Sequence, residues 1–172
     1  MTSSLNSHNS EKRPMRVLVV LGEGGHTTQM LRLVQLLGPI YDYSYLMPKH
    51  DQTSERKIAI AGRMYRAIVP RTKQSSPLET LRLSLLCAVQ ELRILLGVRP
   101  KAILSAGAGI AVPLSFFGRL LGVKIIHVES ASRVRTSSLT GKIMYRIAHL
   151  FFVQWEPLKE KFPKAIYAGR LL

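Results

Sequence analysis

Cysteine is almost absent from this 172-residue sequence: Cys87 is the only one, and it lies in a leucine-rich stretch. A single cysteine excludes an internal disulfide and a thiolate metal cluster built by this chain alone, and it fits a reducing, cytosolic setting. The sequence also lacks a run of about 18 apolar residues, the length that a membrane-spanning helix requires. Met1 to Pro14 contains no apolar run, which excludes a secretory signal and predicts a disordered polar tail.

Acidic residues are scarce as well. Lys and Arg number 25 against 10 Asp and Glu, a net charge of +15, so a partner should be anionic: nucleic acid, phospholipid headgroups or a phosphorylated substrate. Aromatic residues make up only 7% of the chain and no nucleic-acid-binding module is recognisable, so we expect no nucleic-acid partner. The length fits one domain, which we expect to span residues 15–172.

Apolar strand patterns alternate with helical patterns along the rest of the chain. The expected strands are 15–21, 43–47, 66–69, 101–105, 123–128, 150–153 and 165–167. The expected helices are 26–37, 78–96, 113–121, 139–149 and 155–162. This alternation predicts an α/β fold, a Rossmann-like parallel sheet with helices on both faces.

Three loops rich in small or polar residues follow predicted strands: 22–26, 106–109 and 129–135. The carboxyl ends of parallel strands open on one edge of a sheet, and ligands bind there. We therefore expect the three loops to meet.

The first of these loops reads Gly22-Glu23-Gly24-Gly25-His26-Thr27. Thr27 replaces the third glycine of a dinucleotide-binding fingerprint, and no Walker lysine follows, so NAD and a P-loop nucleotide are both unexpected. Backbone amides of Gly24 and Gly25 at a helix start would attract a phosphate, although the carboxylate of Glu23 opposes this unless it points away. His26 can act as a base or can simply cap a backbone amide.

The other two loops carry further candidates. Gly107 and Gly109 allow close approach of a ligand, or merely form a tight turn. Glu129 can hold or deprotonate a substrate hydroxyl, or can pair with a nearby arginine. Arg133 and Arg135 present two guanidinium forks suited to a diphosphate, although a solvated charge run is the alternative.

The helix at 78–96 carries leucines over most of its circumference, with Arg82 and Arg93 between them. Burial in the core explains part of this pattern. The remaining apolar surface, with Phe116 and Phe117 near Arg119, can also dock on an anionic bilayer.

Taken in order, the motifs G-x-G-G-H-T, G-x-G-x-x-x-P, H-V-E-S-x-S-R-V, S-L-T-G-K, V-Q-W and Y-A-G-x-L are more specific than any one of them. From about Arg16 to Leu172 the chain resembles the membrane-recruiting subunit family of the two-component UDP-N-acetylglucosamine transferase that adds the second sugar to dolichyl diphosphate. It is similar also to bacterial exopolysaccharide transferases of the PssD type and, more distantly, to the N-terminal half of MurG.

The resemblance implies one half of a GT-B glycosyltransferase that acts with inversion and needs neither metal nor cofactor beyond a UDP-sugar donor. It implies that His26 or Glu129 is the catalytic base. It also implies a second subunit carrying the nucleotide-sugar half-domain, and a lipid-linked diphosphate sugar as acceptor. We expect peripheral binding to the cytoplasmic face of a membrane. The alternative is a non-catalytic module that recruits or activates a catalytic partner.

By the same resemblance, the acceptor diphosphate is expected to lie against both glycine loops, and the guanidinium forks of the third loop are expected to hold it as well. These residues are Gly24, Gly25, Thr27, Gly107, Gly109, Arg133 and Arg135.

Overall fold

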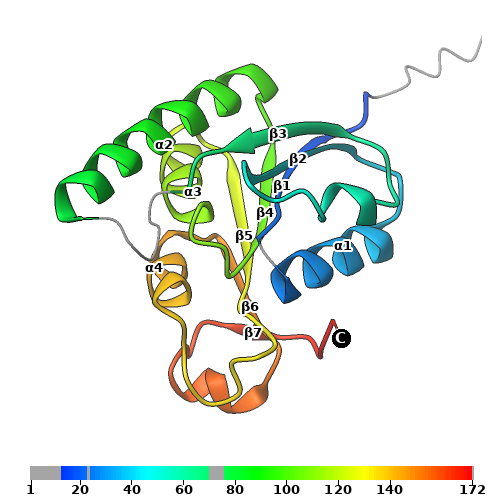
Figure 1. The fold of residues 1–172 in the computed structure, drawn as a ribbon. Coiled ribbons are helices and arrows are strands. Elements are labelled where there is room, and N and C mark those ends of the chain that lie inside the picture. The colour runs from blue at the N-terminus through cyan, green and yellow to red at the C-terminus, as the bar shows by residue number, and fades with distance from the viewer. Residues whose placement is uncertain (1–12, 23, 70–75, 172) are drawn as a thin grey trace, which may run out of the picture.

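The computed structural model describes residues 13–22, 24–69 and 76–171, and Figure 1 shows their arrangement. Seven strands form one sheet in the order β3-β2-β1-β4-β5-β6-β7, and every neighbouring pair is parallel. The strands are β1 (Arg16–Val20), β2 (Asp42–Pro48), β3 (Arg63–Ala67), β4 (Ala102–Ala106), β5 (Lys124–Val128), β6 (Leu150–Val153) and β7 (Ile166–Tyr167).

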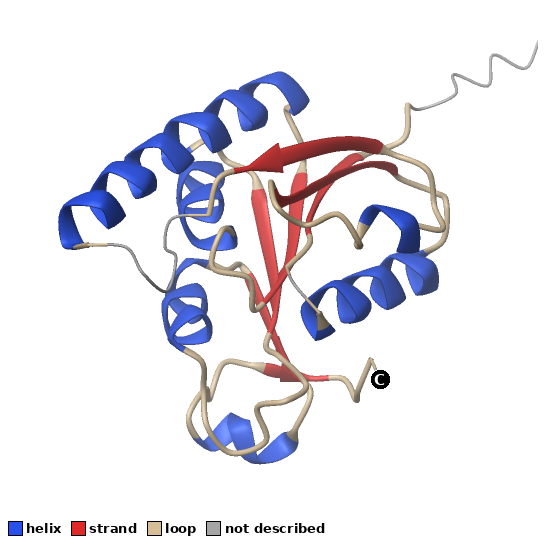
Figure 2. Cartoon of the chain, viewed as in Figure 1, coloured by secondary structure: helices blue, strands red, loops and turns tan. Residues whose placement is uncertain are grey.

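Helices cover both faces of this sheet (Figures 1 and 2). Helix α1 (Gly25–Leu37) packs on one face, while α2 (Pro77–Val98), α3 (Ala111–Leu120) and α4 (Leu139–Ile147) pack on the other. Two short 3₁₀ helices, η1 (Glu55–Lys57) and η2 (Glu156–Glu160), lie in connections. The expected Rossmann-like parallel sheet with helices on both faces is confirmed.

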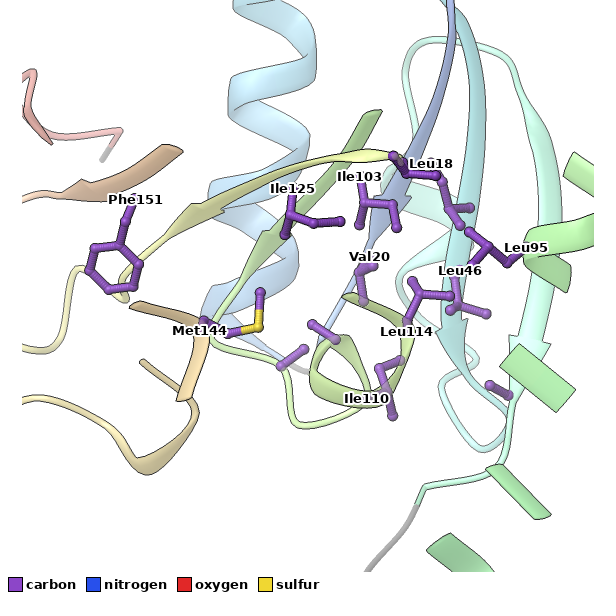
Figure 3. Close-up of a cluster of buried hydrophobic side chains, with 14 of the residues drawn as sticks. Leu18, Val20, Leu46, Leu95, Ile103, Ile110, Leu114, Ile125, Met144 and Phe151 are labelled. Atoms are coloured by element: carbon purple, nitrogen blue, oxygen red, sulfur yellow. The ribbon is translucent and has the colours of Figure 1, made fainter. Parts of the chain in front are cut away.

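The central strands are buried on both faces because helices cover both. In β1, Leu18 and Val20 point into the cluster beneath α2, α3 and α4 that Figure 3 shows. Val17 and Val19 point into the cluster beneath α1. Successive strand side chains point to opposite faces, so a strand covered on both sides reads as a continuous apolar run. The run from Met15 to Leu21 predicted this correctly.

Helix boundaries follow local chemistry. The amide of Glu79 donates to the hydroxyl of Ser76 over 3.3 Å, which caps the start of α2 as the sequence predicted. Helix α1 ends at Gly38, whose φ of +73° suits a residue without a side chain.

Two elements differ from the sequence-based expectation. Strand β3 covers Arg63–Ala67 rather than 66–69. It is an edge strand whose first residues are exposed, so no apolar run marks its start. The segment 155–162 forms the short 3₁₀ helix η2 rather than an α-helix. Pro157 stands in its first turn and Pro163 follows it, so the segment has little room to extend. The expected tail, up to residue 12, and Glu23 lie outside the described residues.

Candidate functional site

The three loops expected to meet do so at the carboxyl edge of the sheet. A Cβ placed on Gly22, after β1, would lie 2.9 Å from Cβ of His26 and 3.1 Å from Cβ of Ala108, after β4. The amide of Ala131, after β5, donates to Oε1 of Gln29 in α1 over 3.1 Å. Loops distant in sequence therefore form one surface.

His26 lies at the centre of this surface, in the first turn of α1. Its ring rests against the backbone of Gly107, where a Cβ would stand 2.4 Å from Cε1 and 2.7 Å from Nδ1. Nδ1 is buried and has no hydrogen-bond partner among the described residues. The side chain as a whole is only half-buried, so Nε2 is the ring nitrogen that solvent can reach.

Charges from the third loop act on this ring. Burial lowers the pKa of His26 below its ordinary 6.5, the nearby Glu129 carboxylate raises it, and the Arg133 guanidinium lowers it, with a net decrease. The imidazole is therefore neutral at neutral pH, with a lone pair available for a proton. Both Glu129 and Arg133 are close enough to His26 to influence its charge.

Glu129 is turned into the protein and is 0% exposed. Its Oε1 accepts hydrogen bonds from the amide of Ser130 and from the hydroxyl of Ser138, each over 3.0 Å. Within the described part of the chain it forms no ion pair with Arg133 or Arg135, the alternative that the sequence left open. Serine hydroxyl and backbone amide hold the carboxylate instead.

Helix α4 begins directly above this carboxylate. Ser138 caps the helix by accepting the amide of Gly141 over 2.8 Å, and the same hydroxyl donates to Glu129. A Cβ on Gly141 would lie 1.5 Å from Oε2 of Glu129, so any larger residue there would have to displace that carboxylate. A carboxylate at a helix N-terminus is stabilised by the partial positive charge of that end.

The glycines at the start of α1 leave backbone amides accessible. Gly24, with φ of +59°, precedes the helix, and no side chain in the described part of the chain caps it. A Cβ on Gly24 or Gly109 would meet no atom within 4 Å, and one on Gly25 would first meet an atom at 4.0 Å. Uncapped amides in open space at a helix N-terminus can hold a phosphate oxygen.

The remaining predicted residues are Thr27, Arg133 and Arg135, and they differ in how far their side chains are exposed to solvent. The Thr27 hydroxyl is buried, donates to the carbonyl of Gly22 over 2.5 Å and lies 2.9 Å from Oγ of Ser54. Its hydroxyl is therefore unavailable to a ligand. Arg133 and Arg135 are both exposed, but only Arg133 contributes to the field at His26.

Sequence reasoning missed two glutamines that join the loops. Oε1 of Gln29 accepts from Nε2 of Gln154 over 2.6 Å as well as from Ala131, and Nε2 of Gln154 donates to the carbonyl of Glu129 over 3.0 Å. Both side chains are buried. Gln154 stands in the V-Q-W motif as a polar residue among apolar ones, and this was the signal in the sequence. Spacing alone did not reveal the partners of Gln154.

Among the described residues, no group of three or more His, Cys, Asp and Glu side chains is arranged to hold a metal ion.

By its fold, the chain is a Rossmann-like half of the kind from which GT-B glycosyltransferases are built. Acinetobacter baumannii MurG superposes with a TM-score of 0.70 at 19% identity, covering 91% of this chain and 45% of MurG. A UDP-N-acetylglucosamine 2-epimerase gives 0.69 at 14% identity, covering 92% of this chain and 49% of the epimerase. The chain thus spans about half the length of these structures.

Within that class the family is specific. Residues 17–171 match the family described as "Oligosaccharide biosynthesis protein Alg14 like", and the chain belongs to it. The mouse protein named "UDP-N-acetylglucosamine transferase subunit ALG14" is 33% identical over 188 residues, covering 96% of this chain and 87% of the mouse protein. The family resemblance inferred from the sequence motifs is confirmed.

Proposed function

We propose that this chain is the acceptor-binding subunit of a split GT-B transferase. It moves a sugar, N-acetylglucosamine or another hexose, from a UDP-sugar onto a lipid-linked diphosphate sugar. The observation that carries the proposal is the convergence of the loops after β1, β4 and β5 around the half-buried His26. The name of the mouse relative, a UDP-N-acetylglucosamine transferase subunit, supports the choice of donor.

His26 is the base in this proposal. Nε2 takes the proton of the acceptor hydroxyl while that oxygen forms a bond to the anomeric carbon, and UDP departs from the opposite face with inversion. The low pKa keeps the imidazole neutral beforehand. Glu129, at 0% exposure, cannot touch the hydroxyl, so it acts as a positioning residue whose negative charge stabilises the imidazolium that forms.

The acceptor diphosphate is held beside this base. We assign its oxygens to the open amides at Gly24 and Gly25, with Thr27 contributing only its backbone amide. The exposed guanidinium of Arg133 supplies positive charge near His26.

The second glycine loop and Arg135 complete the proposed acceptor site. Gly107 serves by leaving room for the imidazole, and Gly109 leaves open space at the start of α3. Arg135 is exposed on the same loop as Arg133 and would reach the outer phosphate. We expect no metal ion and no cofactor in this role, since amides and guanidinium groups supply the positive charge.

A second subunit with the nucleotide-sugar half-domain completes the enzyme in this proposal. The support is that the chain covers 45% of MurG and that the mouse relative is named as a transferase subunit. The test is transfer of radiolabelled sugar by the purified chain with and without its partner. Robust transfer without a partner would refute the split enzyme. Replacement of His26 by Gln should abolish turnover of the complex, whereas near-full turnover would favour the non-catalytic recruiting module.

The proposed complex works on a membrane surface, because the acceptor is a lipid. Leu78, Leu81, Leu85, Val89 and Leu96 form an exposed stripe along α2. At about 100° per residue, this stripe lies roughly opposite the buried Cys87, Glu91 and Leu95. No helix among the described residues has the length and apolarity to cross a bilayer. An apolar stripe flanked by arginines is suited to lie on an anionic membrane.

A further inference from the structure

A compact turn in the connection between β2 and β3 is built on Asp51. Its Oδ1 accepts the amides of Thr53 over 2.9 Å and Ser54 over 3.0 Å, and the Thr53 hydroxyl over 3.1 Å. Its Oδ2 accepts the hydroxyl of Ser54. The Asp51 side chain therefore closes the turn with one oxygen and orients the Ser54 hydroxyl with the other.

Ser54 connects this turn to the first glycine loop. Its Oγ lies 2.9 Å from Oγ1 of Thr27, and both side chains are buried. The Thr27 hydroxyl also lies 2.5 Å from the carbonyl of Gly22. Because Ser54 gives its only proton to Asp51, Thr27 shares its own single proton between Oγ of Ser54 and the Gly22 carbonyl, and so closes the loop that contains His26. A hydrogen-bonded chain thus runs from Asp51 through Ser54 and Thr27 to Gly22.

We propose that Asp51 and Ser54 are positioning residues for the first glycine loop, acting through Thr27 to hold His26 and the open amides of Gly24 and Gly25. This inference deepens the proposed function and rests on it for its consequence in catalysis. Its structural content does not depend on that function, because the hydrogen-bonded chain fixes the loop whatever ligand binds there.

The charge of Asp51 supports this role. Burial raises the pKa of its carboxyl, but hydrogen bonds from Ser54 and Thr53 outweigh burial and leave the pKa below its ordinary 3.8. The carboxylate is therefore ionised at neutral pH and is a strong acceptor for the Ser54 hydroxyl. An ionised acceptor orders Ser54 more firmly than a neutral one, and Ser54 in turn orders Thr27.

A simpler explanation is that Asp51 only caps the turn before η1. The two roles use different atoms, because the turn needs Oδ1 and the amides, whereas the link to Thr27 needs the Ser54 hydroxyl. Ser54→Ala removes the link and keeps the turn. Thr53→Ala is the matched control, since it removes one hydroxyl bond to the same carboxylate and leaves the link intact.

The first measurement is NMR spectroscopy on the isolated chain. It follows the titration of the His26 imidazole and the chemical shifts of the Gly24 and Gly25 amides. In Ser54→Ala the amides should shift and the pKa of His26 should move toward 6.5 as the loop loosens and hydrates. Thr53→Ala should reproduce the wild-type values. Wild-type values in Ser54→Ala would overturn the proposal.

The second measurement is a double-mutant cycle with Thr27→Val, which removes the same contact from the other side with little change in volume. It also serves if Ser54→Ala folds poorly. If Ser54 acts through Thr27, then Ser54→Ala should change the His26 titration little in the Thr27→Val background. Additive effects would overturn the proposal.

The third measurement is transfer by the assembled complex. Ser54→Ala should lower kcat/KM by about two- to tenfold, the factor expected from loss of one hydrogen bond, while the thermal midpoint falls by only a few degrees. A complex that transfers no sugar in any variant, wild type included, would refute the proposed function and leave the NMR result standing. If Ser54→Ala transfers sugar at the wild-type rate while the pKa of His26 is shifted, the structural link stands but its effect on catalysis is refuted.

Discussion

Gly107 and His26 are in direct contact: the imidazole occupies the space that a Cβ on Gly107 would need, 2.4 Å from Cε1. Gly107 also has φ of +64°, a conformation that side chains disfavour. The glycine of the second loop thus determines where the proposed base of the first loop can lie. This contact joins the ends of β1 and β4.

Gly107→Ala should therefore displace His26 and reduce transfer by the complex at least a hundredfold, while destabilising the chain by roughly 1–2 kcal/mol through backbone strain. The measurements are single-turnover transfer and urea unfolding. Gly97→Ala is the control, because a Cβ there meets nothing within 4 Å. It should stabilise α2 slightly and leave transfer unchanged. Wild-type transfer by Gly107→Ala would contradict the assignment of His26.

Two helix-capping serines allow an effect on stability to be measured separately from an effect on catalysis. Ser138 caps α4 and also donates to Glu129, whereas the Ser76 hydroxyl caps α2 by accepting the amide of Glu79. Alanine at either position should cost about 0.5–2 kcal/mol of unfolding free energy. Only Ser138→Ala should also lower kcat, since Glu129 then loses a hydrogen bond. Equal effects of both variants on kcat would show that Ser138 matters to the helix alone.

The pH dependence of transfer tests the charges around His26. A base must be neutral, so kcat/KM should fall as the pH drops through the pKa of His26, which lies below 6.5. Glu129→Gln removes the carboxylate that raises this pKa and should move the acid limb to lower pH. Arg133→Gln removes the guanidinium that lowers it and should move the limb to higher pH. Shifts in the same direction would refute this arrangement.

The sequence predicted the sheet and the meeting of the three loops because both depend on patterns that neighbouring residues define. The apolar runs of β1 and β5 and the glycines after β1 and β4 are local signals. The orientation of Glu129 was not predictable, because it depends on Ser138 and Gly141 folding back over it. Spacing cannot show such a contact, since it forms only when α4 packs on the sheet.

The same limit applies to Thr27. As a residue of the glycine loop it was expected at the ligand, yet its hydroxyl turns inward to Ser54 from the connection after β2. The sequence distance of this pair gives no periodic signal. Likewise, the exposed start of β3 carries no apolar run, so its boundary was misplaced.

His127 predicts how stability varies with pH. The side chain is fully buried, its Nδ1 lies 2.8 Å from the Ser105 hydroxyl, and burial lowers its pKa to about 3, with a further decrease from His26. Above pH 6.5 His127 is neutral in both the folded and the unfolded chain, and its contribution to stability is fully present. Below 6.5 the unfolded chain binds a proton that the folded chain does not, so the free energy of unfolding decreases as the pH falls toward 3. From pH 7 to pH 5 the loss should be about 2 kcal/mol.

Urea unfolding at both pH values measures this loss. His127→Phe preserves the stacking on Phe151, whose ring centroid is 5.4 Å away, but cannot titrate. It should therefore lose clearly less stability between pH 7 and pH 5 than the wild type does. An equal loss in both proteins would show that other groups, not His127, cause the decrease.

The leucine stripe of α2 makes the final prediction, on membrane binding. Leu81 and Leu85 are each 67% exposed, on the side of the helix that faces away from the core. An aspartate at either position places a charge where we propose acyl chains, so affinity for vesicles with anionic lipid should fall roughly tenfold or more in co-sedimentation. Ile40→Asp is the control, because Ile40 is 66% exposed but follows α1, which covers the other face of the sheet (Figure 1). Salt should weaken the remaining binding, since the arginines beside the stripe contribute through charge. If Ile40→Asp lowers affinity as much as Leu81→Asp does, the membrane does not contact α2 selectively and the proposed docking face is wrong.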